Sequence, residues 1–190
     1  MTDTLPARSI TGDDFRYAFR AHPAGVAVIT ADAGDGPVAM TVSSVASVSM
    51  DPPTIMFSAS ALSSSTPTLQ RADTVVVHLL SADDIELAKL GARSGAERFG
   101  PDVDWGRLAT GEPYYPGAHW LRGQITQRVD VSGATLIIVE ALDAKPKSDG
   151  EESDPVPLVY HSRRWHRLSD KSEYVDGPPC PFLHVYGRDD

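Results

Sequence analysis

The sequence predicts a mainly β domain that closes into a barrel and carries a few short helices. Valine-rich runs alternate with stretches rich in serine and threonine, and β-branched residues pack better on a pleated strand than on a helix. Residues 38–50 alternate between apolar and hydroxyl side chains for longer than the usual strand of about five to six residues, so we expect this strand to bend around a barrel. A chain of 190 residues is long enough for one sizeable core and too short for two ordinary domains.

The domain boundaries follow from where these patterns begin and end. We expect a tail over residues 1–10, one domain over residues 11–170, and a second tail over residues 171–190, which have little apolar content. No internal repeat or linker divides the domain.

A short amphipathic helix leads into the domain. Phe15, Ala18 and Phe19 recur at helical spacing. Asp14 stands three residues after Thr11, which is the spacing of a capping box. We therefore expect the helix to begin directly after Thr11.

A hairpin and the long alternating strand follow this helix. Residues 25–31 are apolar and β-branched and predict a strand, and residues 32–37 supply the turn residues of a hairpin. In residues 38–50 one face is expected to lie in the core and the other to carry hydroxyls, with Met40, Val42, Ala46, Val48 and Met50 on the first face and Thr41, Ser43, Ser47 and Ser49 on the second. We expect a bulge near Ser43 and Ser44. Pro52 and Pro53 end the strand because proline cannot donate to a ladder.

The rest of the chain predicts further strands and two helices. The strands are expected at residues 54–59, 74–80, 118–131, 134–144, 157–161 and 165–168. Residues 63–71 form a loop that enters a short helix, and Ser81 with Asp84 caps a second helix that runs through Ile85, Leu87, Ala88 and Leu90. Residues 91–117 are expected to be loop with short helical turns, and residues 145–154 an exposed charged loop.

Charge and composition argue against several classes of function. A formal charge of −9 argues against nucleic-acid binding, which depends on clustered Lys and Arg. No stretch approaches the ~18 apolar residues of a membrane span, and the first ten residues carry no signal region, so we expect a cytoplasmic protein. The single cysteine, Cys180, cannot form an internal disulfide and lies among prolines, so we expect no catalytic role for it.

A cluster of hydroxyls at a predicted helix start is a candidate anion site. Ser63, Ser64, Ser65 and Thr66 stand directly before Pro67. The start of a helix presents unpaired backbone N–H groups and the positive end of the dipole, which favour a phosphate. An ordinary capped helix after a polar loop would carry the same residues, so this pattern leaves both interpretations open.

The hydroxyl face of residues 38–50 is a second candidate site. It lies beside Ser58 and Ser60 on the next predicted strand. A planar heterocycle could lie against such strands and bond to their backbone. A sheet face turned to solvent would show the same pattern.

Histidines complete the set of candidate residues. His78 lies inside an apolar run, so it is either a satisfied core residue or a residue that points into a pocket. The other histidines show no metal-ligand spacing, and we expect no metal site. No Gly-x-Gly-x-x-Gly follows a strand and no Gly-x-Ser-x-Gly is present, so neither a Rossmann site nor a nucleophile elbow is indicated.

Several motifs in a fixed order cover roughly residues 14–168. The chain reads HPAGVAVIT at residues 22–30, MTVSS at 40–44 and VSMDPP at 48–53, followed by SST at 64–66, VHLLS at 77–81, ERF at 97–99 and PLVYH at 157–161. This order resembles the flavin reductase-like family of FMN-binding split-barrel proteins. The TVSS and SMDPP blocks together carry the specificity of the resemblance.

The resemblance implies a Greek-key split β-barrel, usually a homodimer, that binds FMN or FAD near the subunit interface. It implies a flavin site in three parts: Thr41, Val42, Ser43 and Ser44 on the isoalloxazine and ribityl, Ser58, Ala59 and Ser60 flanking the ring, and Ser64, Ser65 and Thr66 on the phosphate. It also favours a pocket position next to the flavin for His78.

Many proteins of this family reduce flavin with NADH or NADPH and supply it to a partner monooxygenase, and the resemblance implies this activity here. The cofactor performs the chemistry, so no acid–base pair is needed. One position departs from the family, since typical members carry Gly-Asp-His where this chain has Gly133-Ala134-Thr135. We expect Thr135 and His78 near the nicotinamide, with His161 or Trp165 adding surface. The departure leaves an alternative, a flavin-binding carrier or a flavoenzyme with another substrate.

Overall fold

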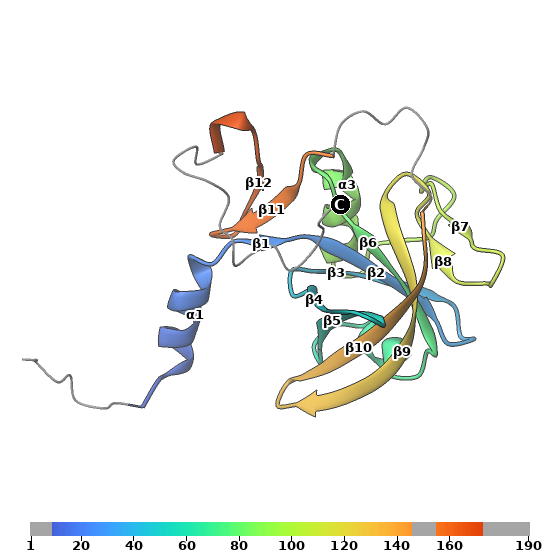
Figure 1. Ribbon diagram of the computed structural model, residues 1–190, viewed down its shortest axis with the longest axis horizontal. Helices are drawn as coiled ribbons and strands as arrows, with labels where there is room; N and C mark the ends of the chain where they lie inside the picture. The colour runs from blue at the N-terminus through green and yellow to red at the C-terminus, as the bar shows by residue number, and fades with distance from the viewer. Residues whose placement is uncertain (1–8, 146–154, 173–190) are drawn as a thin grey trace, which may run out of the picture.

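A seven-stranded antiparallel sheet is the framework of the fold (Figure 1). The computed structural model describes residues 9–145 and 155–172. The strand order is β3-β2-β6-β9-β10-β5-β4. The strands are β2 (Ala27–Asp32), β3 (Pro37–Val42), β4 (Ala46–Met50), β5 (Pro53–Ser60), β6 (Thr74–Leu79), β9 (His119–Val131) and β10 (Ala134–Ala144).

The connection between the two edge strands makes the sheet curl. β3 and β4 lie at opposite edges, yet only residues 43–45 separate them in the chain. A link of that length spans at most about 15 Å, whereas a flat sheet of seven strands would be about 29 Å wide. The edges must therefore approach each other. The link itself is tied to β5, because Ser44 Oγ accepts a hydrogen bond from Ser58 N at 2.9 Å. The result is an open, split barrel, which confirms the predicted fold class.

The prediction of one bent strand over residues 38–50 is wrong. The alternation continues across a break at residues 43–45, where a bulge was expected, and the two halves join different parts of the sheet. Met40 and Val42 on β3 are buried as predicted, but Val48 and Met50 on β4 are 49% and 62% exposed. Side-chain period fixes which residues share a face of a strand, but it does not fix what covers that face.

A smaller sheet has the order β1-β11-β12 and lies beside β2. It consists of β1 (Ala24–Gly25), β11 (Leu158–His161) and β12 (Arg164–Arg167). The strand predicted over residues 25–31 is therefore divided at Val26, with β1 in the small sheet and β2 in the large one. A further pair, β7 (Gly106–Arg107) and β8 (Pro113–Tyr114), lies where short helical turns were expected.

The helices begin where their caps predict. α1 (Gly12–Arg20) has the Thr11–Asp14 capping box, and Ser81 with Asp84 forms another at η1 (Ala82–Asp84), which leads into α3 (Ile85–Ala92). The remaining helices are α2 (Thr66–Leu69) and η2 (Asp170–Ser172). α1 projects away from the barrel in Figure 1, and none of its residues is buried.

Two apolar clusters form the core. The first fills the barrel and includes Ile29, Phe57 and Ile137, all fully buried. The second lies under α3 and includes Val28 and Leu158. Because β2 sends alternate residues to the two clusters, it joins the barrel interior to the layer that carries α3 and the small sheet.

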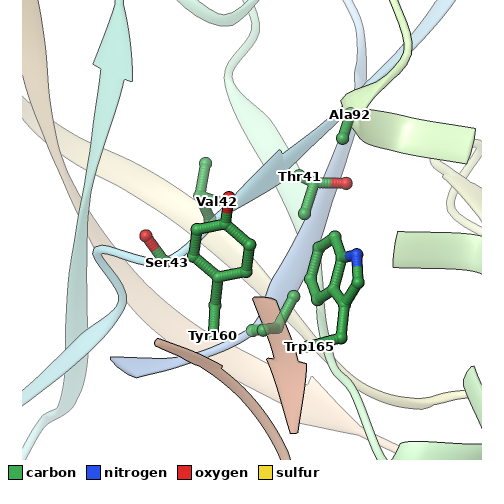
Figure 2. A pocket seen from close by; sticks show the side chains of 7 residues that line it. Thr41, Val42, Ser43, Ala92, Tyr160 and Trp165 are labelled. Carbon is green, nitrogen blue, oxygen red and sulfur yellow. The ribbon is translucent and has the colours of Figure 1, made fainter. Parts of the chain in front are cut away.

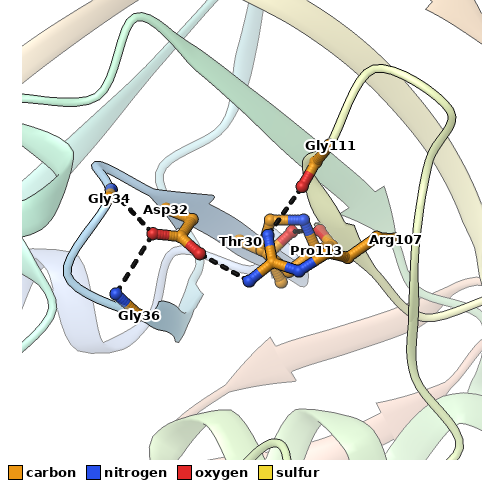
Figure 3. Close-up of polar contacts among 7 residues, drawn as sticks. All are labelled: Thr30, Asp32, Gly34, Gly36, Arg107, Gly111 and Pro113. Atoms are coloured by element: carbon orange, nitrogen blue, oxygen red, sulfur yellow. Dashed lines mark hydrogen bonds and ion pairs between the residues drawn. The ribbon is translucent and has the colours of Figure 1, made fainter.

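Asp32 fixes the hairpin between β2 and β3 and ties it to the β7–β8 segment (Figure 3). Its Oδ1 accepts hydrogen bonds from Gly34 N at 2.8 Å and Gly36 N at 3.2 Å, and both glycines have positive φ values that other residues rarely adopt. Arg107 donates to Asp32 Oδ2 at 2.6 Å. Burial on its own would raise the pKa of Asp32, but the hydrogen bonds from Arg107 and the two glycines outweigh it and lower the pKa.

Several expectations fall on residues 1–8, 146–154 and 173–190, which lie outside the described residues. These are most of both predicted tails, nearly all of the charged loop, and Cys180. In the part of the chain that is described, no helix is long and apolar enough to cross a membrane.

Candidate functional site

A small cavity lies between the end of β3 and the β11–β12 hairpin. Its volume is about 170 Å³, and it is lined by Val26, Thr41, Val42, Ser43, Ala92, Tyr160 and Trp165. Figure 2 shows the rings of Tyr160 and Trp165 beside Val42 and Thr41, with Ala92 at the end of α3. The two ring centroids are 4.8 Å apart and the planes are inclined at 57°. Aromatic walls and a few hydroxyls are typical of a site for a flat organic ring.

A larger cleft of about 1060 Å³ adjoins this cavity and shares Ser43 and Tyr160 with it. It extends between α1, the loop of residues 43–45 and the β11–β12 turn. Sites for organic ligands commonly have about 300–1000 Å³. The small cavity can therefore hold only part of such a ligand, and the cleft can hold the rest.

Thr41 is fixed by the contact between β3 and α3. Its Oγ1 donates a hydrogen bond to Ala88 O at 2.7 Å. Gly91 permits this contact, because a Cβ on Gly91 would lie 2.4 Å from Thr41 Oγ1 and 3.1 Å from Thr41 N. The absence of a side chain at residue 91 thus sets the position of the cavity wall.

The loop of residues 43–45 offers backbone groups to a ligand. Among the described residues, Ser43, Ser44 and Val45 take part in no backbone–backbone hydrogen bond of a turn, loop or cap. Solvent-facing backbone N–H and C=O groups without a partner in the protein can bond to a ligand in place of water, and the edge of an isoalloxazine presents the matching acceptors and donors. This loop also lies at the border of the cavity and the cleft, which fits the predicted contact of Thr41, Val42, Ser43 and Ser44 with a flavin.

The second predicted group, Ser58, Ala59 and Ser60, adjoins the first but lines neither the cavity nor the cleft. Ser58 is linked to Ser44 through its backbone. Ala59 is fully buried in the barrel core, and Ser60 is exposed at the end of β5. Within this group, only Ser60 is left exposed to solvent.

The side chains of the third predicted group, Ser64, Ser65 and Thr66, differ in direction: two point into the protein and one is exposed. Ser65 Oγ donates to Ala39 O at 2.8 Å, and Thr66 Oγ1 donates to Ser60 O at 2.6 Å. Both residues are buried, and α2 has only 4 residues. Both hydroxyls are therefore already used inside the protein, and the expectation that they hold a phosphate stays a prediction without support from these contacts. Ser64 is exposed.

A comparison of Ser64 with Ser65 tests this division. Ser64→Ala should weaken FMN binding by up to about tenfold, the value of one charge-assisted hydrogen bond, and should leave binding of riboflavin, which lacks the phosphate, unchanged. Ser65→Ala should instead lower the free energy of unfolding by about 1–3 kcal/mol, because it leaves a buried carbonyl without its donor. Titrations with both flavins and urea unfolding measure these effects. Equal losses of FMN and riboflavin binding in Ser64→Ala would contradict a phosphate contact.

His78 is a core residue, which favours the first of the two interpretations of its sequence and gives no support to a place beside the flavin. It is fully buried; its Nδ1 lies 3.0 Å from Val28 O, and its Nε2 accepts from Tyr115 N at 3.0 Å. Burial lowers the pKa of His78 to about 4 although the bond to Val28 opposes the shift. The neutral ring thus joins two strands of the barrel to the segment that carries Tyr115, and it lines neither the cavity nor the cleft.

Thr135 is likewise turned away from any cavity. It is 2% exposed, accepts a hydrogen bond from Gln70 Nε2 at 2.9 Å and donates one to Asp130 Oδ1 at 3.0 Å. These contacts give no support to the expectation that Thr135 faces a nicotinamide. A histidine at this position would have to displace Gln70, so the residue serves to hold β10 against the end of α2.

Sequence reasoning gave no role to Val26, Ala92 and Tyr160, which line the cavity, and only a minor one to Trp165. Tyr160 stood in a matched motif without a role, and Trp165 was named only as extra surface for a nicotinamide. Their position depends on the pairing of β11 with β1, which no local pattern predicts. Gly91 was also missed, and its only signal was a glycine near the end of a helical pattern.

Comparisons with known proteins decide the family. A family model described as "Flavin reductase like domain" matches residues 19–169. The chain belongs to this family. This confirms the family that the sequence resembled, and with it the class of activity, NAD(P)H-dependent flavin reduction.

Relatives within the flavin reductase family are similar over most of their length. The NADH:FMN oxidoreductase of Rhodococcus erythropolis is 40% identical over 159 residues, which are 83% of this chain and 82% of that protein. The FMN reductase (NADH) SmoA of Agrobacterium fabrum is 36% identical over 157 residues, which are 82% and 85% of the two chains.

Two solved structures show the same fold. A flavin reductase domain protein from Arthrobacter sp. FB24 matches with a TM-score of 0.76 and 32% identity, over 84% of this chain and 96% of that one. BorF, the flavin reductase component of a bacterial two-component tryptophan halogenase, matches with a TM-score of 0.72 and 29% identity, over 84% and 99% of the chains.

Proposed function

We propose that this protein binds FMN in the cavity between β3 and the β11–β12 hairpin and reduces it with NADH. The observation that carries the proposal is the loop of residues 43–45, which among the described residues makes no turn, loop or cap hydrogen bond through its backbone. Its Ser43 borders a cavity walled by Tyr160 and Trp165. The choice of FMN and NADH over FAD and NADPH is supported by the names of the relatives from Rhodococcus and Agrobacterium.

The side chains around the cavity bind and orient the flavin. A bound flavin supplies the hydride chemistry itself. Backbone groups of residues 43–45 fix the polar edge of the ring, and Thr41 is held in place from behind by Ala88. Tyr160 and Trp165 provide apolar surface that excludes water. Of the phosphate-binding residues predicted from the sequence, we retain Ser64, which is exposed.

Reduction of the bound flavin tests this function. Anaerobic NADH added to protein with stoichiometric FMN should bleach the absorbance of oxidised flavin within seconds. FMN that binds tightly but is bleached by neither NADH nor NADPH would refute the reductase activity. It would support the second candidate function, a flavin carrier, which the departure at Gly133-Ala134-Thr135 from the family pattern favours.

We further propose that the reduced flavin passes to a separate oxygenase in the cytoplasm. The description of BorF as one component of a two-component halogenase supports this proposal. Addition of an excess of an oxygenase apoprotein from the same source should lower the peroxide that forms when reduced flavin meets oxygen. Unchanged peroxide with every candidate oxygenase would count against flavin transfer.

We also propose a homodimer. β4 is an edge strand with large exposed apolar side chains at Val48 and Met50, and both unpaired edges and apolar patches are ordinarily covered. A second copy packed two-fold on this edge is the commonest solution.

Sedimentation at micromolar concentration should therefore give twice the chain mass of 20.4 kDa. Combining Val48→Lys with Met50→Lys should shift the protein to the monomer, because two charges would be buried at the interface. Leu168→Lys, at a site 43% exposed and outside the large sheet, is the matched control and should stay dimeric. A wild-type monomer with flavin fully bound would contradict the dimer.

A further inference from the structure

The large cleft beside the flavin cavity is cationic in a chain with an excess of acidic residues. The chain has 26 Asp and Glu against 17 Lys and Arg. Among the described residues that line the cleft there are nevertheless three arginines, two histidines and no carboxylate. The basic residues are Arg16, Arg20, His22, His161 and Arg163. Such a local reversal of charge favours an anionic ligand.

Two of the arginines that line the cleft are free to bind an anionic ligand. In the described part of the chain, Arg20 and Arg163 make no ion pair, whereas Arg16 pairs with Asp13 at 2.9 Å on the exposed surface. Guanidinium groups bind phosphate oxygens in a bidentate manner. Two free arginines on one cleft thus suit a diphosphate better than a single carboxylate.

The two arginines are held near each other by the β11–β12 turn. Ser162 N and Ser162 Oγ both donate to Arg20 O, at 3.2 and 3.3 Å, and Arg163 is the next residue. Ser162 and Arg163 have φ values of 50° and 62°, which non-glycine residues adopt only at an energetic cost. The turn therefore holds Arg163 beside the C-terminal end of α1. It does so with a backbone conformation that arginine rarely adopts.

Aromatic rings lie in the same cleft. Phe15 and Phe19 stack with their centroids 4.4 Å apart, and His22 meets Phe19 edge-on at 6.0 Å. Both phenylalanines remain more than half exposed. Exposed rings beside cationic groups suit a nucleobase attached to phosphates, because every base has a face that stacks.

We propose that this cleft binds the adenosine 5′-diphosphate half of a dinucleotide, with Arg20 and Arg163 on the diphosphate and the adenine against Phe15 and Phe19. The inference rests on the proposed function, since the ligand's other half would reach the flavin cavity through the shared wall at Ser43 and Tyr160. NAD(P)H and FAD both contain this half.

ADP itself is the probe that tests the site, by calorimetry on the flavin-free protein. Arg20→Gln and Arg163→Gln should each weaken ADP binding by about tenfold, since a hydrogen bond to a charged group is lost, and added salt should weaken the wild type most. Both side chains are exposed, so neither change should unfold the protein. Arg164→Gln is the matched control, because Arg164 is exposed, adjacent to Arg163 and absent from the cleft lining.

Two further measurements on these variants show which dinucleotide, NAD(P)H or FAD, places its ADP half in the cleft. A raised KM for NADH with unchanged FMN and FAD affinity identifies the pyridine nucleotide, and weakened FAD binding with unchanged FMN binding identifies the flavin dinucleotide. Wild-type affinity for ADP in both variants, or an equal loss in Arg164→Gln, would overturn the proposal. Anaerobic bleaching of FMN by NADH in the wild type tests the reductase activity separately, so the two can fail independently.

Discussion

Replacing Gly91 by alanine should disrupt both the stability and the flavin site of this protein. The new Cβ would lie 2.4 Å from Thr41 Oγ1, 3.1 Å from Thr41 N and 3.4 Å from Val28 Cγ2. Overpacking of this kind costs about 1–3 kcal/mol. Because α3 and β3 would separate, Ala92 and Thr41 would move apart at the cavity wall, and displacements of about 1 Å can lower a rate by up to about a hundredfold.

We therefore expect Gly91→Ala to lower the free energy of unfolding by about 1–3 kcal/mol and FMN-dependent NADH oxidation by about tenfold to a hundredfold. Gly117→Ala is the control, because a Cβ there meets nothing within 4 Å. Adding Thr41→Ala to Gly91→Ala removes the atom nearest the new Cβ and should restore part of the stability. Wild-type stability and activity in Gly91→Ala would show that the α3–β3 contact does not set the site.

Replacing Arg122 by alanine should cause the largest loss of stability among the changes considered. Arg122 Nε donates a hydrogen bond to Glu112 Oε1, and Arg122 Nη2 lies 2.8 Å from the same oxygen. The side chain of Arg122 is 17% exposed and that of Glu112 is 6% exposed. Removing one partner of a buried pair leaves the other charge without compensation, which costs about 3–5 kcal/mol. The pair of Arg71 with Asp35 is half exposed, so Arg71→Ala should cost less than about 1 kcal/mol.

The pair of Glu112 with Arg122 also predicts how the stability of the protein changes at acidic pH. Burial on its own would raise the pKa of Glu112, but hydrogen bonds from Arg122, Thr110 and Thr74 outweigh it and lower the pKa from 4.5 to about 2. A carboxyl whose pKa is lower in the folded state stabilises the fold above pH 4.5 and loses this contribution as the pH falls to about 2, here about 3 kcal/mol. Urea unfolding at several pH values should show this loss in the wild type and not in Glu112→Gln. Identical pH profiles in the two proteins would contradict the assignment.

Local signals in the sequence predicted most of the elements. The capping boxes at Thr11 and Ser81 marked the starts of α1 and of the η1–α3 segment, because a cap depends only on residues within one turn. Turn residues likewise marked the hairpin at Asp32. The alternation of residues 38–50, by contrast, carried no information on strand pairing, so the break that places β3 and β4 at opposite edges could not be predicted from it.

The sequence could predict which segment of the chain borders the candidate site, but not the directions in which the side chains point. The resemblance placed residues 41–44 at the ligand, and these residues do border the cavity. The same resemblance assigned Ser65, Thr66, His78 and Thr135 to ligands, yet each is buried and hydrogen-bonded within the protein. Position in a motif fixes the path of the chain, whereas the partners of a buried polar group depend on segments distant in sequence.

A crystal structure of the protein with FMN tests the proposed site most directly. We predict that the isoalloxazine edge bonds to the backbone of residues 43–45 and that the rings of Tyr160 and Trp165 lie in van der Waals contact with the flavin, with the phosphate near Ser64. A flavin bound elsewhere on the barrel, with Tyr160 and Trp165 packed only against each other, would contradict the site on which the proposed reduction depends.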